Sequence, residues 1–433
     1  MNNESSIFKA AVGMSSKWDA KEAGREVAKN TLDRLGEKPS FLLLLSSIHY
    51  KENGGFKEFL KGVWEILPEG TPLVGGTVTG FINPEGCYIR GATALAVSYP
   101  NMDVSIGYGT GTKRNPDKAA EECINMIRNG LERSEHKNKF VFDFVSGSTV
   151  LNIPGYGNRK VVDSEFIGKS VTKLFGLTQI LLQKGLGRED EIFEEIAKKL
   201  PDCNMILGSS MDDYRGLFNY QFFNSKVLTN SVVGLGIATD LDIDVNTNHG
   251  MRRTGIKMKI TKLSKDGHII QEINGKPAVP EIYRLLNWPK NFLKEETLFQ
   301  KLLYYPLSLK KSGREVPAVM AIILGDYIVT PCKVEEGDVW ILTVSGKSLL
   351  KAMKSNLEVF NEMRPEFGLF SVCITILETL GSNVCKLREN IIEYLEDKPF
   401  ILFFSTGEGT YSPTKGFAYA NMSYNTAIFG HKK

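Results

Sequence analysis

The sequence lacks any hydrophobic run long enough to cross a membrane. Its strongest apolar run, Phe41 to Leu45, has the length of a strand, whereas a membrane helix needs roughly 18 apolar residues. The chain also lacks a charge excess, because 53 lysines and arginines balance 50 aspartates and glutamates to a net charge of +3. The polar first residues, Met1 to Glu4, are unlike a signal peptide. We therefore expect a cytoplasmic protein that binds neither membranes nor nucleic acid.

Cysteine and histidine are few and scattered. The six cysteines include no CxxC pair, which favours buried free thiols in a reducing compartment over disulfides or a metal site. The five histidines have no partner at metal-ligand spacing, and no HExxH, GxSxG or Walker A motif is present. The sequence therefore predicts no metal ion and no cofactor, and these motifs identify no catalytic residue.

What the chain does contain is a pattern that occurs twice. In each copy a short apolar strand ends in glycine and small hydroxyl residues, at Val74–Thr77 and at Leu207–Ser210. An apolar strand precedes each copy, at 41–46 and at 140–145, and a long β-rich run follows it. A unit that is repeated in this way predicts two similar modules packed face to face.

The repeat indicates the fold class and the domain organisation. We predict an α+β fold in which two repeated strand–helix–strand–hairpin modules form packed mixed sheets flanked by helices, with a smaller α+β unit at the C-terminus. The N-terminal domain is placed at residues 15–275, with modules at about 15–135 and 136–275, and the C-terminal domain at 276–430.

Local signals predict several individual elements. Asp19 suits the N-cap of a helix, and Asn115 followed by proline is a second helix start. The sequence Asn83–Gly86 is typical of a tight turn and predicts a hairpin. The apolar segment 371–377 is predicted to be a strand.

Four glycine-bearing loops are candidate ligand contacts. Glycine lets a ligand approach the backbone closely, free N–H groups at a strand end can hold an anion, and hydroxyls add donors and acceptors. If the strands end at one edge, these loops converge on a crevice. The alternative is that the glycines only make turns. The candidates are Gly75, Gly76, Thr77, Ser146, Gly147, Ser148, Gly208, Ser209, Gly407, Glu408 and Gly409.

A polar cluster at 248–253 adds three further candidates. Arg253 could hold a carboxylate, His249 could titrate near neutral pH, and Asn248 lies beside them. Glu408, between two glycines, could bind an amine. The alternative for the cluster is a solvated basic loop.

The order of motifs resembles the FIST family, named for F-box and intracellular signal-transduction proteins. The family's "VGCSTAGEI"-like turn corresponds to Val74–Ile82, and its most specific match is Glu272–Ala278. In the C-terminal part, Tyr305–Leu307 and Tyr424–Thr426 fit the expected order. The resemblance covers residues 15–430. This chain departs from the family pattern where Gly76 and Phe81 replace a cysteine and an acid, and where Thr406 and Glu408 replace a cysteine and an arginine.

The resemblance implies a sensory module that binds a small ligand, such as an amino acid or a similar metabolite. Because we expect no room for an output domain, the protein would signal through a protein partner in trans. A second hypothesis is an enzyme that acts on a small amino or carboxylic compound, with Ser148 or His249 as the reacting group. A third is a scaffold protein that needs no ligand.

Overall fold

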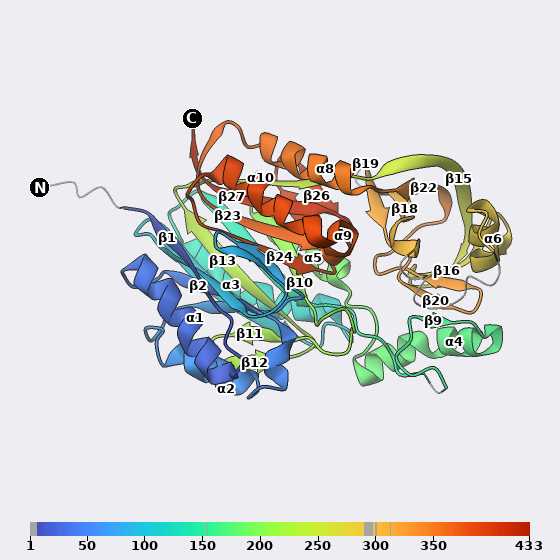
Figure 1. Ribbon diagram of the computed structural model, residues 1–433, viewed down its shortest axis with the longest axis horizontal. Coiled ribbons are helices and arrows are strands. Elements are labelled where there is room, and N and C mark those ends of the chain that lie inside the picture. The colour runs from blue at the N-terminus through green and yellow to red at the C-terminus, as the bar shows by residue number, and fades with distance from the viewer. Residues whose placement is uncertain (1–6, 154, 290–297, 299–300, 312) are drawn as a thin grey trace, which may run out of the picture.

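The protein has a body of three sheets and a lobe built on a fourth sheet, as the computed structural model shows (Figure 1). The structure describes residues 7–153, 155–289, 298, 301–311 and 313–433. Helices flank these packed mixed sheets, which confirms the predicted α+β class. None of the described helices is long and apolar enough to cross a membrane.

The three sheets of the body share one strand order. The first sheet runs β1 (Lys9–Ser15), β6 (Ala92–Ser98), β2 (Phe41–Ser46), β3 (Leu73–Thr77), β11 (Gln221–Phe223) and β12 (Lys226–Leu228). The second runs β7 (Met102–Thr110), β13 (Ser231–Thr239), β8 (Asn138–Ser146), β10 (Asn204–Ser210), β25 (Gly409–Ser412) and β26 (Gly416–Tyr419). The third runs β14 (Asp242–Asn248), β27 (Tyr424–Lys432), β23 (Met363–Cys373), β24 (Phe400–Ser405), β4 (Phe81–Asn83) and β5 (Gly86–Tyr88).

Each of the three sheets is completed by a hairpin from a distant part of the chain, and these hairpins interlock the sheets. The central strands β2–β3, β8–β10 and β23–β24 are parallel pairs. Beside each pair lies a hairpin from another part of the chain, with β11 on β3, β25 on β10 and β4 on β24. The C-terminal segment thus supplies a third sheet with the order of the two predicted modules, and the chain cannot be cut at 275 without breaking strand pairs.

Two helices cover the outer face of each sheet in the body. The pairs are α1 (Ala20–Leu35) with α2 (Phe56–Trp64), α3 (Pro116–Arg133) with α5 (Glu189–Lys199), and α8 (Gly346–Glu358) with α10 (Lys386–Leu395). The predicted N-caps are confirmed, since the side chain of Asp19 accepts a hydrogen bond from Glu22 N and that of Asn115 accepts one from Lys118 N.

One predicted strand is wrong in its second half. Strand β23 ends at Cys373, and residues 374–380 form helix α9 instead of continuing the strand predicted for 371–377. The β-branched residues of this segment favour a strand, but Ile376 and Leu380, four residues apart, are buried on one face of a helix in the core that contains the third sheet's outer residues. Tertiary packing therefore overrides the local preference.

The inner faces of the three sheets meet in a common core. Phe142 and Phe144 of the second sheet pack against Phe403 of the third, and Leu43 and Leu95 close the core from the first. The core fixes the ends of the central strands relative to one another, because all three sheets contribute to one buried cluster.

The described part of the lobe contains a long sheet with helices on its sides. Its strands are β19 (Arg314–Ala318), β18 (Leu307–Lys311), β22 (Gly337–Thr343), β15 (Arg252–Leu263), β16 (Ile269–Ile273), β21 (Tyr327–Val329), β20 (Ile322–Leu324) and β9 (Val161–Val162), with β17 (Lys276–Pro277) on β16. Helix α6 (Ala278–Leu285) and helix α4 (Glu165–Leu182) flank it. Strand β9 and α4 belong to the long connection between β8 and α5 of the body. This connection therefore contributes a strand and a helix to the lobe.

Candidate functional site

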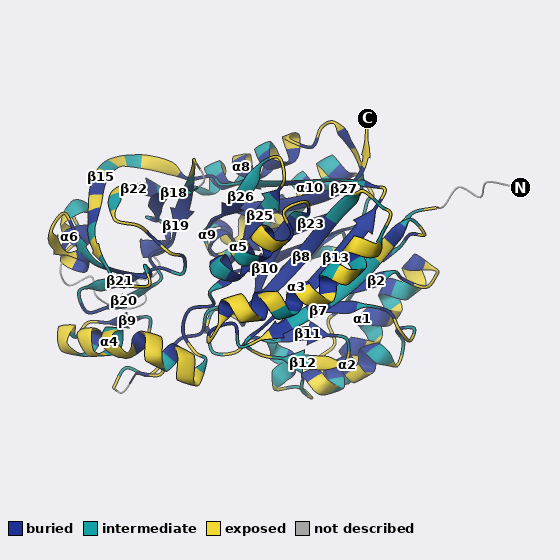
Figure 2. Ribbon diagram, turned by 180° about the vertical axis from the view of Figure 1, so that it is seen from behind, coloured by how far each residue is buried: buried dark blue, intermediate teal, exposed yellow. Residues whose placement is uncertain are grey.

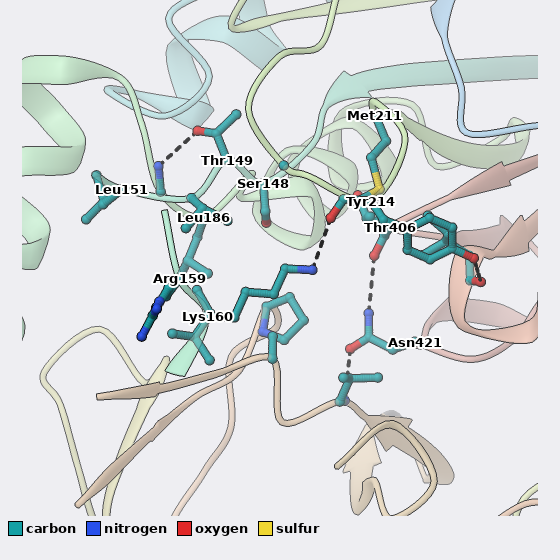
Figure 3. Close-up of a pocket in the computed structure, with 18 of the residues that line it drawn as sticks. Ser148, Thr149, Leu151, Arg159, Lys160, Leu186, Met211, Tyr214, Thr406 and Asn421 are labelled. Atoms are coloured by element: carbon teal, nitrogen blue, oxygen red, sulfur yellow. Dashed lines mark hydrogen bonds between the residues drawn. The ribbon is translucent and has the colours of Figure 1, made fainter. Parts of the chain in front are cut away.

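A cavity of about 140 Å³ lies where the strand ends of the second and third sheets meet the lobe (Figure 3). Its walls come from the segments after β8, β10, β23 and β24, from the region of β20 in the lobe, and from helix α4. The lining is mainly apolar, with Val150, Phe175, Leu186, Met211 and Ile322 among the residues that form it. A small compound with an apolar part therefore fits the chemistry of this space.

Polar side chains line part of the same cavity. Ser148, Thr149, Lys160, Thr406 and Asn421 all contribute to the lining. The hydroxyl of Ser148 accepts a hydrogen bond from Gly187 N at 3.0 Å, and Lys160 Nζ donates to Tyr214 O at 3.1 Å. These bonds fix the side chains in place, which is how a binding site orients a ligand.

Three of the four predicted loops come together at this site. Ser209 Oγ lies 2.8 Å from Thr406 Oγ1 and accepts a hydrogen bond from Gly407 N at 2.9 Å. A Cβ added to Gly147 would lie 2.8 Å from Thr406 Oγ1, so this glycine allows the loops to approach. Ser146 is also buried here and donates to Asn219 Oδ1 at 2.8 Å.

Of these predicted residues, Ser148 lines the cavity, and the others support its wall. Gly208 lies under the loops, where a Cβ would meet the ring of Phe403 at 2.4 Å. Gly409 begins β25, where a Cβ would meet Ala418 O at 2.7 Å. At both positions the glycine serves close packing between strands. Their role as direct ligand contacts stays a prediction.

The first predicted loop lies outside the cavity lining. Gly75 and Gly76 are within β3 and pair with β11, and added Cβ atoms would lie 1.7 Å from Leu44 O and 2.3 Å from Tyr220 O. Thr77 Oγ1 accepts a hydrogen bond from Tyr220 N at 3.0 Å. The neighbouring backbone therefore fills the space beside these two glycines, and a ligand contact at this loop stays a prediction.

The polar cluster at 248–253 also lies away from the residues that line the cavity. Arg253 forms an ion pair with Glu315, with NH2 and Oε2 2.9 Å apart. His249 Nε2 lies 3.1 Å from Glu315 O, and burial lowers the pKa of His249. The side chain of Asn248 donates to Ala352 O at 3.1 Å. These contacts join β14 and β15 to neighbouring elements.

Two buried carboxyl groups lie behind the cavity wall. Glu408 is fully buried, and neither of its carboxyl oxygens has a hydrogen-bond partner among the described residues. Burial, together with the charge of Glu189, raises the pKa of Glu408 well above its ordinary value. Glu189 is also buried, and burial raises its pKa to about 7. Both groups favour the neutral form, as expected for carboxyls without a strong partner.

Lys113 is a buried cation that our interpretation of the sequence did not identify. It is fully buried and donates a hydrogen bond to Thr149 Oγ1 at 3.0 Å, directly behind the cavity lining. Burial lowers its pKa to about 7, while the charge of Glu189 opposes that shift. In the sequence, Lys113 stands beside Arg114 in what resembles an ordinary surface loop. Only the fold reveals that it points inward.

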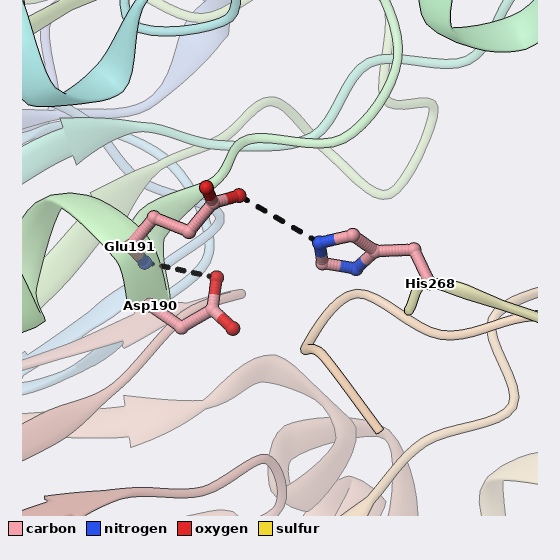
Figure 4. Close-up of side chains that lie close together, drawn as sticks. All are labelled: Asp190, Glu191 and His268. Carbon is pink, nitrogen blue, oxygen red and sulfur yellow. Dashed lines mark hydrogen bonds and ion pairs between the residues drawn. The ribbon is translucent and has the colours of Figure 1, made fainter. Parts of the chain in front are cut away.

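A cluster of charged side chains lies where the body contacts the lobe (Figure 4). Asp190 and Glu191 at the start of α5 lie close to His268 of the lobe, with 3.7 Å between Glu191 Oε1 and His268 Nε2. Carboxylates and imidazole can bind Zn²⁺. Here, however, the oxygens of Glu191 contact Arg188 at 2.5 Å and Lys333 at 3.0 Å. A divalent cation would have to displace these positive groups, so the contacts describe an ionic junction between body and lobe.

The fold and the site together define an α+β protein with a cavity at the junction of two structural parts. The sequence model of the FIST N domain matches residues 40–276, which is more than half of the chain. The protein therefore belongs to the FIST family, whose domains are sensory and bind small ligands. This confirms the resemblance given by the motifs.

Other comparisons give little beyond the family. No curated protein matches the chain. Among solved structures, a cyanuric acid hydrolase from A. caulinodans is similar over 55% of this chain and 72% of that chain, at 7% sequence identity and a TM-score of 0.27. A likeness this low carries no argument about activity.

Proposed function

We propose that this protein is a cytoplasmic sensor that binds a small metabolite, an amino acid or a related compound, and signals through a protein partner. The ligand would occupy the cavity between the body and the lobe. The observation that carries the proposal is that both parts build the cavity wall, with Thr406 from the body and Ile322 from the lobe. Membership of a family of sensory domains supports it.

The lining indicates which compounds should be tested first. An engineered apolar cavity of about 150 Å³ in another protein binds benzene, so a cavity of about 140 Å³ suits a branched or aromatic side chain. Leu186 and Phe175 would surround that apolar part, and the hydroxyls of Thr149 and Thr406 would bind the polar end. We therefore favour apolar amino acids and the corresponding acids over charged amino acids.

A ligand in this position would signal by changing how the lobe sits on the body. A compound that contacts both walls binds the closed arrangement more tightly than an open one, and it shifts the equilibrium by that difference in affinity. The junction of Glu191 with Lys333 crosses the same boundary and would hold the closed form together.

Thermal unfolding with candidate ligands tests the proposal. We expect apolar amino acids or their acid analogues to raise the Tm by a few degrees at saturating concentration, because binding stabilises the folded state. Thr406→Val should reduce this shift by removing a lining hydroxyl. Thr31→Val is the matched control, since Thr31 is buried in α1 and bonds to Val27 O at 2.7 Å. If none of these amino acids or acid analogues raises the Tm, the proposal is wrong.

An enzyme acting on a small amino or carboxylic compound is the second candidate function. The contact that favours it is the hydrogen bond from Lys113 to Thr149, because an amine with a pKa of about 7 could take a proton from a hydroxyl nucleophile. Ser148 lines the same space, whereas His249 does not. Product formation that Lys113→Met abolishes would favour the enzyme, and ligand-induced stabilisation without turnover would favour the sensor.

A further inference from the structure

Helix α4 exposes an apolar stripe to solvent. Phe166, Leu177 and Leu181 are 81%, 57% and 64% exposed, and Leu174 and Ile180 extend the same surface. Leu177 is three residues from Leu174 and from Ile180 and four from Leu181, and Phe166 lies about two turns before Leu174, so all five face one side of the helix. Figure 2 shows that α4 lies at the edge of the molecule with much of its surface exposed. Exposed apolar residues gathered in this way mark an interaction surface.

The opposite side of α4 is part of the cavity wall. Val171 and Phe175 line the cavity. Gly168 packs so closely on the lobe that an added Cβ would lie 2.4 Å from the carbonyl carbon of Leu324. The helix is therefore anchored by one face and presents the other to solvent. An apolar outer face does not stabilise the isolated chain, because it stays in contact with water.

The size of the stripe fits a two-fold contact with a second copy of this chain. Its five large apolar side chains, each between 44% and 81% exposed, would form the apolar centre of an interface, which in a standard complex buries roughly 800 Å² per partner. A two-fold axis pairs the same face of both copies, so one apolar stripe serves both sides. Antiparallel α4 helices would bring Phe166 of one copy against Leu181 of the other, and the small Ser170 against Leu177.

Charges at the two ends of α4 agree with the antiparallel arrangement. Asp163 and Glu165 lie at the N-terminal end, where Glu165 also pairs with Lys169 of the same helix, and Lys184 follows the C-terminal end. In an antiparallel pair the acidic end of one helix meets the basic end of the other, which favours this orientation over a parallel one. The helix carries only a few lysines, so its electrostatic attraction to a membrane of anionic lipid would be weak.

We propose that the protein forms a homodimer through the outer faces of two antiparallel α4 helices. The proposal of a dimer does not depend on the proposed ligand. Because Val171 and Phe175 belong to the same helix, ligand binding would also change the dimer dissociation constant, and that second part rests on the proposed function.

Sedimentation velocity of the full chain, over concentrations from below to well above micromolar, tests the dimer. We expect a dimer in the unmodified protein and a shift of at least tenfold toward monomer in Leu177→Asp and in Leu181→Asp. Ile89→Asp is the matched control, because Ile89 is 76% exposed on another part of the surface, and it should remain dimeric. All variants should keep the parent Tm at monomer concentrations, since these side chains contact solvent.

Cross-linking distinguishes this interface from other modes of association. A short bis-maleimide should join two copies of Leu174→Cys, which lies near the expected axis, more efficiently than two copies of the parent protein with its exposed Cys385. Three results would overturn the proposal. The protein could stay monomeric at all concentrations, the dimer could persist in the double variant Leu177→Asp with Leu181→Asp, or a monomer could bind anionic vesicles through α4. Ligand-induced stabilisation in a strictly monomeric protein would leave the sensor intact and reject only the dimer.

Discussion

The end of the first sheet and the ends of the second and third sheets have similar residues but different surroundings. At the first, the hydroxyl of Thr77 accepts from Tyr220 N and its carbonyl accepts from Met211 N. At the other two, Ser209 contacts Thr406, whose side chain reaches the cavity. A strand that ends in glycine and hydroxyl residues is thus a common element, and the segments that cover it decide whether it can meet a ligand.

The covering segments explain the difference. The connection 147–188 and the lobe lie over the second and third sheets and leave a cavity beneath them. At the first sheet the nearby backbone of 211–220 fills the equivalent place. Substitutions at the two kinds of strand end should therefore affect different measurements, with folding altered at one and ligand binding at the other.

The largest effect is expected for Gly75→Ala. The added Cβ would lie 1.7 Å from Leu44 O, between two parallel strands of the core, and the backbone φ of +152° disfavours alanine. We expect a loss of more than about 3 kcal/mol in the free energy of unfolding, measured by urea denaturation. Gly416→Ala is the control: its φ of +73° is also positive, but no heavy atom lies within 4 Å of the new Cβ. It should cost about 1 kcal/mol, and equal losses at both sites would reject the packing argument.

The next effect concerns pH and the buried carboxyl groups behind the cavity. Burial raises the pKa of Glu189 to about 7 and that of Glu408 well above its ordinary value. The folded state therefore binds more protons than the unfolded state above the ordinary carboxyl pKa, and the stability contributed by these groups falls as pH rises from about 5 through 7. Asp143, whose pKa burial raises to about 8, adds to this trend from another part of the core.

Glu408→Gln sharpens this prediction. A neutral amide of similar shape cannot ionise, so the variant should lose less stability than the parent between pH 5 and pH 8. The gap in stability between the variant and the parent should widen as pH rises from 5 to 8, measured by denaturation at a series of pH values. Asp143→Asn should also reduce the slope without changing ligand binding. Because the lowered pKa values of Lys113 and His249 act in the opposite sense, the test is the difference between variant and parent. A Glu408→Gln variant whose stability falls as steeply with pH as that of the parent would contradict the assignment.

Local chemistry made part of this architecture predictable. Asp19 and Asn115 cap helices through contacts within a few residues, and the turn at Asn83–Gly86 depends on the same short range. The central strands themselves also follow from apolar runs of strand length, although their parallel pairing does not. These features require no knowledge of the rest of the chain.

The site depended on contacts between distant residues, which the sequence does not display. Sequence patterns did not show that β4, β11 and β25 each pair with the sheet of another unit. They also could not show that Lys113 turns inward toward Thr149, 36 residues away, or that Arg253 pairs with Glu315. Glycine and hydroxyl residues marked the strand ends correctly, but their exposure to a cavity is set by segments elsewhere in the chain.

A moderate effect on binding is expected at the cavity itself. Thr149→Val removes a hydroxyl that lines the cavity and receives the hydrogen bond of Lys113. Ligand affinity should fall about tenfold, as expected when one hydrogen bond is lost, measured by isothermal titration with the best ligand from the thermal screen. Thr77→Val should leave affinity unchanged in the folded fraction, because Thr77 is bonded to Tyr220 away from the cavity lining. Equal losses in the two variants would remove the distinction between the strand ends.

The smallest effect is expected for Arg253→Ala, in the polar cluster that the sequence predicts as a carboxylate site. Arg253 is paired with Glu315 at the surface, with nearly half of its side chain exposed. Exposed ion pairs contribute little to stability, so the free energy of unfolding should hardly change and ligand affinity should not change. High salt should reduce even this difference, because solvent ions screen the pair. Should Arg253→Ala abolish binding while Thr149→Val does not, the ligand site would lie at the β14–β15 junction and the cavity would be only a packing defect.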